Sequence, residues 1–220
     1  MAAGALGRAY DATWGRLFAS FYDRALKASE ENGLGAMRAE LLAGARGRVV
    51  EIGAGTGVNL DLYGAGVEDL TLVEPDPHMG ARLRDRLAAR AGGAPTRLLA
   101  APAEAIPSPD DTYDTAVATL VLCTVPDPVA AIAELARVLK PGGRLLFIEH
   151  VRSDDPARAR RQDRLEKPWR FMADGCYCNR DTEATLRASA FEFDALDHGI
   201  LPKSLPIVRP LIHGTATLTA

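Results

Sequence analysis

The chain has 220 residues, of which 47% are hydrophobic and 25% charged, and its formal net charge is −3. This length suits one large domain with a buried core, and the charge gives no reason to expect a nucleic-acid partner. Three cysteines are too few for a disulfide framework and favour a reducing, cytoplasmic setting. The N-terminal residues hold no long apolar run typical of a secretory signal, and the longest apolar segment, 115–125, is shorter than the roughly 20 residues of a membrane span.

Hydrophobic periodicity predicts alternating helices and strands as far as residue 151. The predicted helices cover 11–27, 34–42, 77–93 and 127–143, and glycines close the last two. Short apolar runs predict strands at 48–52, 69–74, 96–101, 113–122 and 144–151. Near-continuous apolar strands that alternate with helices are typical of a parallel sheet covered on both faces.

Beyond residue 151 the alternation breaks. Residues 153–179 are polar, basic and aromatic, and we assign no regular element to them. A helix is predicted over 181–190, a half-exposed strand over 191–197 and a last strand over 211–220. The sequence has no internal repeat and no linker long enough to separate two domains, so we interpret 1–220 as one domain.

A glycine-rich turn follows the first predicted strand. Gly53, Gly55 and Gly57 alternate with small residues, and Glu51 precedes them in the strand. Such a turn lies at the carboxyl edge of a parallel sheet, where its backbone N–H groups can approach a ligand. A dinucleotide fingerprint would place a glycine at position 58, which is a valine here. This spacing disfavours an NAD-dependent oxidoreductase.

The segment EIGAGTG (51–57) resembles the first motif of class I S-adenosylmethionine-dependent methyltransferases. Later segments agree with that family in the expected order, namely 72–79, 100–107, 119–128 and 137–150. The resemblance implies an α/β, Rossmann-like fold with a mostly parallel seven-stranded sheet, helices on both faces and an N-terminal helical lid. It also divides the domain into a helical cap (1–45), a cofactor-binding core (46–151) and a substrate-side region with the last strands (152–220).

The same resemblance implies S-adenosyl-L-methionine as cofactor and S-adenosyl-L-homocysteine as product. In that family the turn wraps the methionine end, the first carboxylate helps to position the amino group, and a carboxylate after the second strand accepts both ribose hydroxyls. The implied cofactor-binding residues are Tyr22, Glu51, Gly53, Ala54, Gly55, Thr56, Gly57, Asn59, Glu74, Pro75, Met79, Ala103, Glu104, Thr119, Leu120, Val121 and Cys123.

The last hundred residues resemble a narrower group. LVLC, EHV, the Pro-Trp pair, DGC and the closing VRPLIHG are similar to the methyltransferase-like seven family of alkyl thiol S-methyltransferases and its bacterial relatives. Members of that family carry an apolar N-terminal anchor, whereas this chain has the amphipathic helix 11–27. Their segment before DGC is more apolar, whereas residues 157–167 here are strongly basic. A solvated helix face explains the basic run, and a weak contact with a membrane surface is the alternative.

Candidate residues for the methyl acceptor lie outside the glycine turn. His150 closes the fifth strand and is either a general base or a hydrogen-bonded strand-end residue, and Asp174 either receives a proton or caps a turn. We expect substrate contacts from Tyr10, Trp14, Trp169 and Cys176. Because the four histidines are scattered in sequence, no metal site is predicted.

The predicted function is methylation of a small molecule, with a thiol as the favoured acceptor. A thiol needs little base because its pKa is near 8.5, whereas a hydroxyl would need one, for which His150 is the candidate. Alternatives are O- or N-methylation of a natural product or quinone-like metabolite, and a catalytically inactive cofactor-binding partner subunit. Nucleic-acid methylation is disfavoured because no Asn/Asp-Pro-Pro-aromatic segment follows the fourth strand. The oligomeric state stays open.

Overall fold

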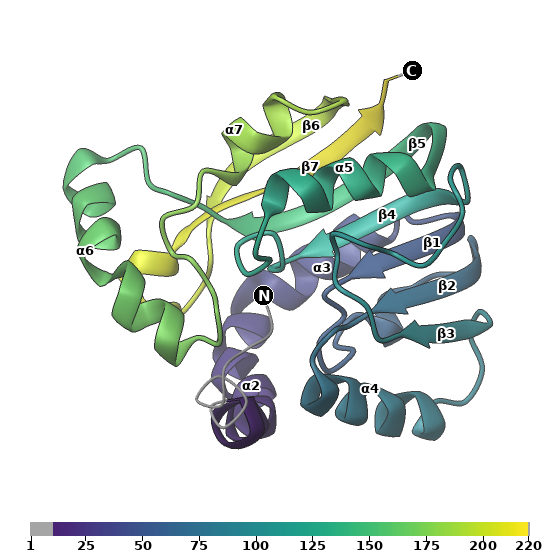
Figure 1. Ribbon diagram of the computed structural model, residues 1–220, viewed down its shortest axis with the longest axis horizontal. Helices are drawn as coiled ribbons and strands as arrows, with labels where there is room; N and C mark the ends of the chain where they lie inside the picture. The colour runs from purple at the N-terminus through teal and green to yellow at the C-terminus, as the bar shows by residue number, and fades with distance from the viewer. Residues whose placement is uncertain (1–10, 220) are drawn as a thin grey trace.

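A seven-stranded sheet forms the centre of the computed structural model, which describes residues 11–219 (Figure 1). Its strand order is β3-β2-β1-β4-β5-β7-β6. β1 to β5 pair in parallel, whereas β7 runs antiparallel to both β5 and β6. The strands are β1 (Gly47–Ile52), β2 (Val67–Val73), β3 (Thr96–Leu99), β4 (Tyr113–Thr119), β5 (Leu139–His150), β6 (Phe191–Ile200) and β7 (Pro210–Leu218). The predicted mostly parallel seven-stranded sheet is therefore confirmed.

The helices are α2 (Arg16–Ser29), α3 (Gly35–Leu42), α4 (Pro77–Ala89), α5 (Pro128–Val138), α6 (Pro156–Met172) and α7 (Thr182–Arg187). A π-helical turn, Asp11–Gly15, leads into α2, and Gly33, with φ 136°, makes the kink between α2 and α3. α4, α5 and α6 share one kind of start. Each begins with a proline after an aspartate (Asp76, Asp127 or Asp155) whose carboxylate accepts backbone N–H groups of the first turn.

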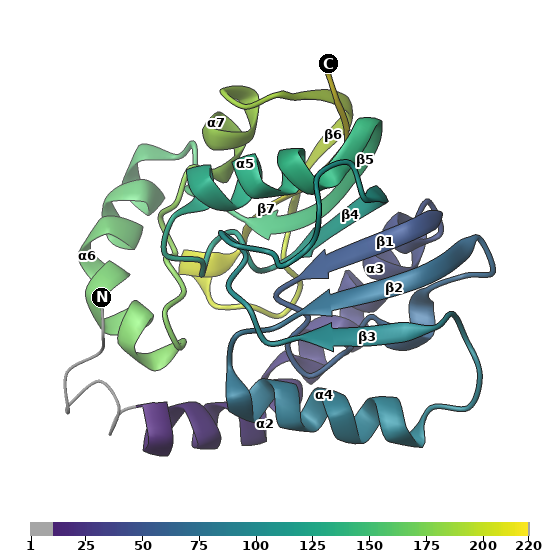
Figure 2. The same cartoon turned by 45° about the vertical axis from the view of Figure 1, so that its right-hand side comes forward.

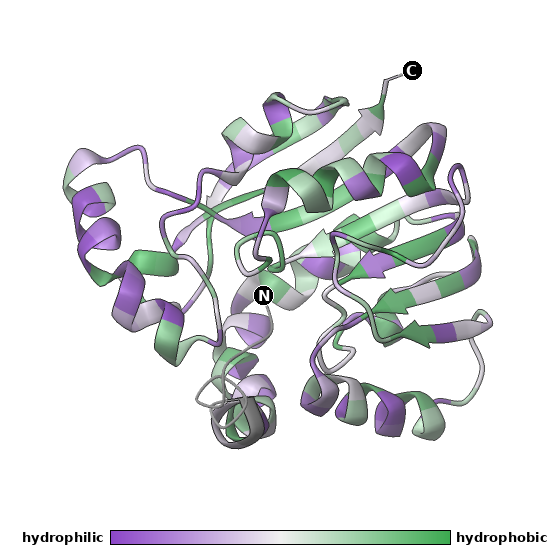
Figure 3. Ribbon diagram, in the orientation of Figure 1, coloured by the Kyte–Doolittle hydropathy of each residue, from purple (hydrophilic) through white to green (hydrophobic). Residues whose placement is uncertain are grey.

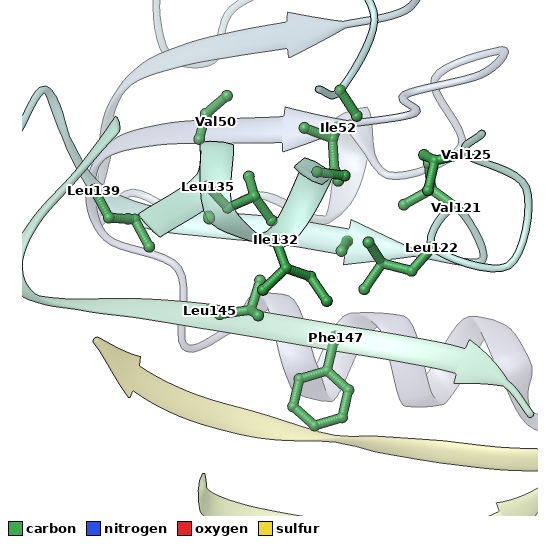
Figure 4. Packing of buried hydrophobic residues seen from close by; sticks show 14 of the residues in the cluster. Val50, Ile52, Val121, Leu122, Val125, Ile132, Leu135, Leu139, Leu145 and Phe147 are labelled. Carbon is green, nitrogen blue, oxygen red and sulfur yellow. The ribbon is translucent and has the colours of Figure 1, made fainter. Parts of the chain in front are cut away.

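Alternate strand residues pack on opposite faces of the sheet. Val50 and Phe147 lie on the face covered by α5 and α7, where they pack with Leu135 and Leu186 (Figure 4). Val49 lies on the other face, in a second cluster that includes Leu42 of α3 and Leu83 of α4. This period of two is what buries a parallel sheet on both sides.

α2 and α6 lie beyond the carboxyl ends of the central strands, and α2 runs beside α4 (Figures 1 and 2). α6 is mostly hydrophilic, with hydrophobic residues toward its C-terminal end (Figure 3). The loops that follow β1, β2, β4 and β5 therefore lie at the edge of the sheet on which these two helices are placed.

The structure differs from the sequence prediction in several details. Residues 139–143, which we placed at the end of a helix, begin strand β5 instead. Residues 156–172, to which we assigned no element, form α6. β4 ends at Thr119 rather than at 122, because Leu120 adopts a left-handed backbone with φ 57° that a strand does not tolerate. No helix among residues 11–219 is long and apolar enough to cross a membrane.

Candidate active site

Three glycines after β1 all adopt left-handed backbones, with φ of 60° at Gly53, 56° at Gly55 and 83° at Gly57. A Cβ added to Gly53 would lie 2.2 Å from Cγ2 of Val121, and one added to Gly57 would lie 2.5 Å from Cδ1 of Leu83. A Cβ on Gly55 would meet nothing nearer than 3.9 Å. Gly53 and Gly57 therefore allow close packing of the turn, whereas Gly55 leaves open space beside it.

Glu74, directly after β2, joins two loops. Its Oε2 accepts the N–H of Gly55 at 2.8 Å and its Oε1 accepts the N–H of Asp76 at 2.8 Å. Burial raises the pKa of Glu74 to about 7, although both N–H groups act against this increase. The carboxylate thus titrates near neutrality, and its remaining lone pairs can accept hydroxyl donors.

Glu51, near the end of β1, is buried and already hydrogen-bonded. Nδ2 of Asn59 and the hydroxyl of Tyr63 each donate to its carboxylate at 2.7 Å. Burial raises the pKa of Glu51, and these two donors and Arg38 oppose the rise. The carboxylate is therefore held in one orientation at the edge where the glycine turn begins.

Arg38 of α3 is a buried cation that the sequence analysis did not single out. Its guanidinium donates to Oγ1 of Thr119 at 2.8 Å and to Oδ1 of Asn59 at 3.2 Å, and it pairs with Glu30 at 3.1 Å. It therefore connects the ends of β1 and β4 to the N-terminal helices. One arginine in a short amphipathic helix resembles a surface residue, so the sequence held no signal for this role.

The turn after β4 is held by a carboxylate from the neighbouring strand. Oε1 of Glu149 accepts the N–H groups of Val121 and Leu122 at 2.9 and 2.8 Å, and Oε2 accepts that of Cys123 at 3.3 Å. Glu149 is fully buried, and burial raises its pKa against the pull of these N–H groups. This contact fixes the backbone of 121–123 relative to the end of β5.

Two thiols and an imidazole meet at the end of β5. Nε2 of His150 lies 2.9 Å from Sγ of Cys176, and the Sγ atoms of Cys176 and Cys123 lie 4.0 Å apart. Nε1 of Trp169 also donates to Sγ of Cys176 at 3.3 Å. The hydrogen bond with Cys176 and burial hold the pKa of Cys123 well above its ordinary value. Although distant in sequence, His150 and Cys176 are thus neighbours.

α2 covers this edge. Asp23 accepts the hydroxyl proton of Thr56 in the glycine turn at 2.6 Å. Trp14, just before α2, stacks on Phe171 of α6 with ring centroids 6.3 Å apart. Burial raises the pKa of Tyr22, and the thiols of Cys123 and Cys176 contribute to this increase while Arg38 opposes it. Tyr22 therefore lies near the cluster of thiols.

The other predicted site residues lie at the same edge in different settings. Ala54, Met79 and Ala103 are buried, Pro75 is exposed, and Oε1 of Glu104 accepts the N–H of Asp127 at 3.0 Å. Asp174 is half-buried in the turn before Cys176, with φ 47°. Tyr10 lies outside the described residues. The basic side chains of α6 face mostly solvent.

The glycine turn and Glu74 fit the S-adenosyl-L-methionine cofactor that the sequence resemblance implies. The open space beside Gly55 is what a ligand that approaches the turn backbone needs. Glu74 adds a buried carboxylate with free lone pairs at the end of the neighbouring strand. These two features match the binding of a charged amino-acid end and a ribose at adjacent loops.

Comparisons with known proteins identify the relatives of this chain. A family described as "Methyltransferase domain" matches residues 50–147. Thiol S-methyltransferase TMT1B of Rattus norvegicus is 36% identical over 171 residues, which cover 76% of this chain and 69% of that protein. Thiol S-methyltransferase TMT1A of Homo sapiens is 33% identical over 178 residues, which cover 79% and 72%. The crystal structure of the [4+2]-cyclase SpnF superposes with a TM-score of 0.69 at 20% identity, over 85% of this chain and 80% of that one. This last likeness concerns the fold alone.

Proposed function

We propose that a small-molecule thiol is the methyl acceptor of this chain, which belongs to the class I S-adenosylmethionine-dependent methyltransferases. One observation carries the choice of acceptor. The chain is 33–36% identical, over more than three quarters of its length, to proteins named thiol S-methyltransferases. The residues at the carboxyl edge of the sheet support the same choice.

The donor half of the site is the glycine turn with Glu51 and Glu74. Bound S-adenosylmethionine supplies an electrophilic methyl group on a cationic sulfonium. In our proposal Glu74 accepts the ribose hydroxyls, because it has free lone pairs at the loop where that sugar belongs. Glu51, fixed by Asn59 and Tyr63, provides negative charge toward the amino end. The chain thereby aligns the reactants, which can remove several kcal/mol of barrier.

The acceptor half has the character expected for a sulfur nucleophile. Cys123, Cys176 and the indole of Trp169 provide soft, weakly hydrated groups rather than a row of carboxylates. A thiol with a pKa near 8.5 is about 3% ionised at pH 7, so a small population of the nucleophile forms without a dedicated base. A buried setting then excludes water from the reaction.

The histidine and the aromatic side chains take supporting roles in this proposal. Nε2 of His150 faces Sγ of Cys176, so His150 shapes the acceptor side instead of standing free as a base. Asp174, in the turn before Cys176, is the candidate to receive the acceptor proton. Tyr22 closes the site from α2, Trp14 closes it from the turn before α2, and Trp169 closes it from α6.

A matched panel of acceptors tests the proposal. Release of S-adenosylhomocysteine should be measured with thiophenol, phenol and aniline, which share one phenyl ring and differ in the nucleophilic atom and its acidity. We expect turnover with thiophenol and at least about a hundredfold lower kcat/KM with the other two.

The alternatives give different results in the same panel. Faster turnover with phenol or aniline would replace the thiol with an oxygen or nitrogen acceptor. S-adenosylhomocysteine binding in calorimetry without turnover on any acceptor would point to a cofactor-binding subunit without catalysis. Either result rejects thiol methylation.

A further inference from the structure

Cys123, His150 and Cys176 bring three soft ligand atoms together inside the protein. The atoms all lie within 4.8 Å of one another, and each residue is at most 9% exposed. They come from the turn after β4, the end of β5 and the loop after α6. We propose that these residues bind one Zn²⁺ ion and that the sulfur of the methyl acceptor occupies its fourth coordination position.

The donor set and its spacing suit zinc. Zn²⁺ binds four ligands tetrahedrally, with bonds of about 2.3 Å to cysteine and about 2.0–2.1 Å to histidine. Those bonds place two sulfurs about 3.8 Å apart and a sulfur and a nitrogen about 3.5 Å apart. The sulfurs here are already 4.0 Å apart, and Nε2 of His150 must withdraw by roughly half an ångström from its 2.9 Å contact with Cys176. The third pair, His150 with Sγ of Cys123, lies within 4.8 Å and must reach the same S–N separation when the ion binds.

The backbone holds the ligands in place before any ion binds. Cys123 is in the turn fixed by Glu149, and its carbonyl oxygen accepts the N–H of Tyr177 at 2.8 Å. Arg180 ties the same two segments together by donating to the carbonyl oxygens of Leu122 and Val125, each at 2.7 Å. The loop that carries Cys176 is therefore anchored to the loop that carries Cys123. Binding of the ion therefore requires little further ordering of these two loops.

The cluster places two Sγ atoms and one imidazole nitrogen in a buried position where they converge on one point. Nδ1 of His150 has no hydrogen-bond partner among the residues that the structure describes, and a Zn²⁺ ion at Nε2 does not change this. The three converging ligand atoms therefore carry the assignment. Two thiolates and one Zn²⁺ ion sum to zero charge, so a loaded site would bury no net charge of its own.

The role of the ion toward the acceptor rests on the proposed thiol methylation, whereas its binding by the three residues does not. Three protein ligands leave one position open, as in catalytic zinc sites. A thiol that coordinates zinc loses its proton, which Asp174 passes on to solvent, and it is held as a thiolate. Its lone pair then forms the new S–C bond as the C–S bond of the sulfonium breaks, and that electron pair stays on the departing sulfur. The neutral thioether product is a weaker ligand and leaves.

Titration of reduced, tag-free protein with Co²⁺ tests the site, because thiolate-bound tetrahedral cobalt absorbs visible light. We expect one Co²⁺ per chain, displaced by Zn²⁺, and a change in the absorption bands when 2-mercaptoethanol is added but not with ethylene glycol. Cys123→Ser and Cys176→Ser should each weaken Zn²⁺ binding at least about tenfold. Cys178→Ser is the matched control, because Cys178 packs in a separate cluster with Ile207 and Val208.

A measurement on the unmodified chain removes any dependence on the folding of variants. Zn²⁺ binding should release about two protons, measured by calorimetry in buffers of different ionisation enthalpy, since two thiols must lose theirs. Absence of the cobalt bands, or no proton release, overturns the metal site. Bands that ignore 2-mercaptoethanol overturn the role of the open position. Thiol turnover that fails in zinc-loaded protein with intact bands rejects the proposed function but leaves the metal site standing.

Discussion

Replacing Gly53 with alanine should damage the fold, whereas replacing Gly55 should damage mainly cofactor binding. A left-handed backbone costs a non-glycine residue about 1–2 kcal/mol at either position. At Gly53 the new methyl group also lies 2.2 Å from Val121, and such overpacking typically costs about 1–3 kcal/mol. Gly53→Ala should therefore lose about 2–5 kcal/mol, or roughly 4–20 °C in Tm, and Gly55→Ala only about 1–2 kcal/mol.

Urea unfolding and calorimetry with S-adenosylhomocysteine separate the two effects. Gly55→Ala places a methyl group in the open space beside the turn, so its affinity should fall at least about tenfold. Adding Val121→Ala to Gly53→Ala removes the 2.2 Å contact but leaves the Val121 Cβ at 2.7 Å, so it should recover about 1 kcal/mol in a double-mutant cycle. Equal unfolding midpoints for the two single variants, or no recovery in the double variant, would refute this reasoning.

Four further predictions concern charged groups. The affinity for S-adenosylhomocysteine should rise about tenfold from pH 6 to pH 8, because a pKa near 7 at Glu74 leaves about a tenth of the carboxylate ionised at the lower pH and about nine tenths at the higher. In the ligand-free protein the raised pKa of Glu74 also makes the free energy of unfolding depend on pH. This contribution to stability is present below the ordinary glutamate pKa of 4.5 and is lost as pH rises through 7. Urea titrations across this pH range detect the loss. Arg38→Met should lose about 3–5 kcal/mol of unfolding free energy because it strips a buried network of its cation, whereas Arg86→Met, in a half-exposed pair, should lose under about 1 kcal/mol. Glu149→Ala leaves three backbone N–H groups without their acceptor and should lose at least about 3 kcal/mol in the same assay, and a loss under 1 kcal/mol would contradict its role in holding the turn.

The sheet could be predicted because its strands carry their own signal. Apolar runs bounded by glycine and proline identify parallel strands, and the order of the motifs adds the topology. α6 was missed because most of its side chains face solvent and the two that are buried, Ala159 and Gln162, do not form an apolar stripe. The Asp155-Pro156 pair at its start matches the pairs before α4 and α5 and could have revealed it.

The meeting of distant side chains could not be predicted in the same way. Cys176 reaches His150 only because a helix leads away from the sheet and the following loop returns, held by Tyr177 and Arg180. No local pattern encodes that return. Arg38 was hidden for a related reason, because its burial comes from packing of α3 against the strand ends rather than from its own neighbours in sequence.

The two attachments of the N-terminal helix have a kinetic consequence. One side of α2 is tied to the glycine turn through Asp23 and Thr56, while the segment before it rests on α6 through Trp14 and Phe171. One helical segment thus contacts both the glycine turn and α6, which in our proposal border the cofactor and the acceptor. Movement of this segment to release one product also loosens its contact beside the other product. We therefore expect the methylated product and S-adenosylhomocysteine to leave in one shared slow step. A variant that loosens the segment should turn over faster and bind both products more weakly.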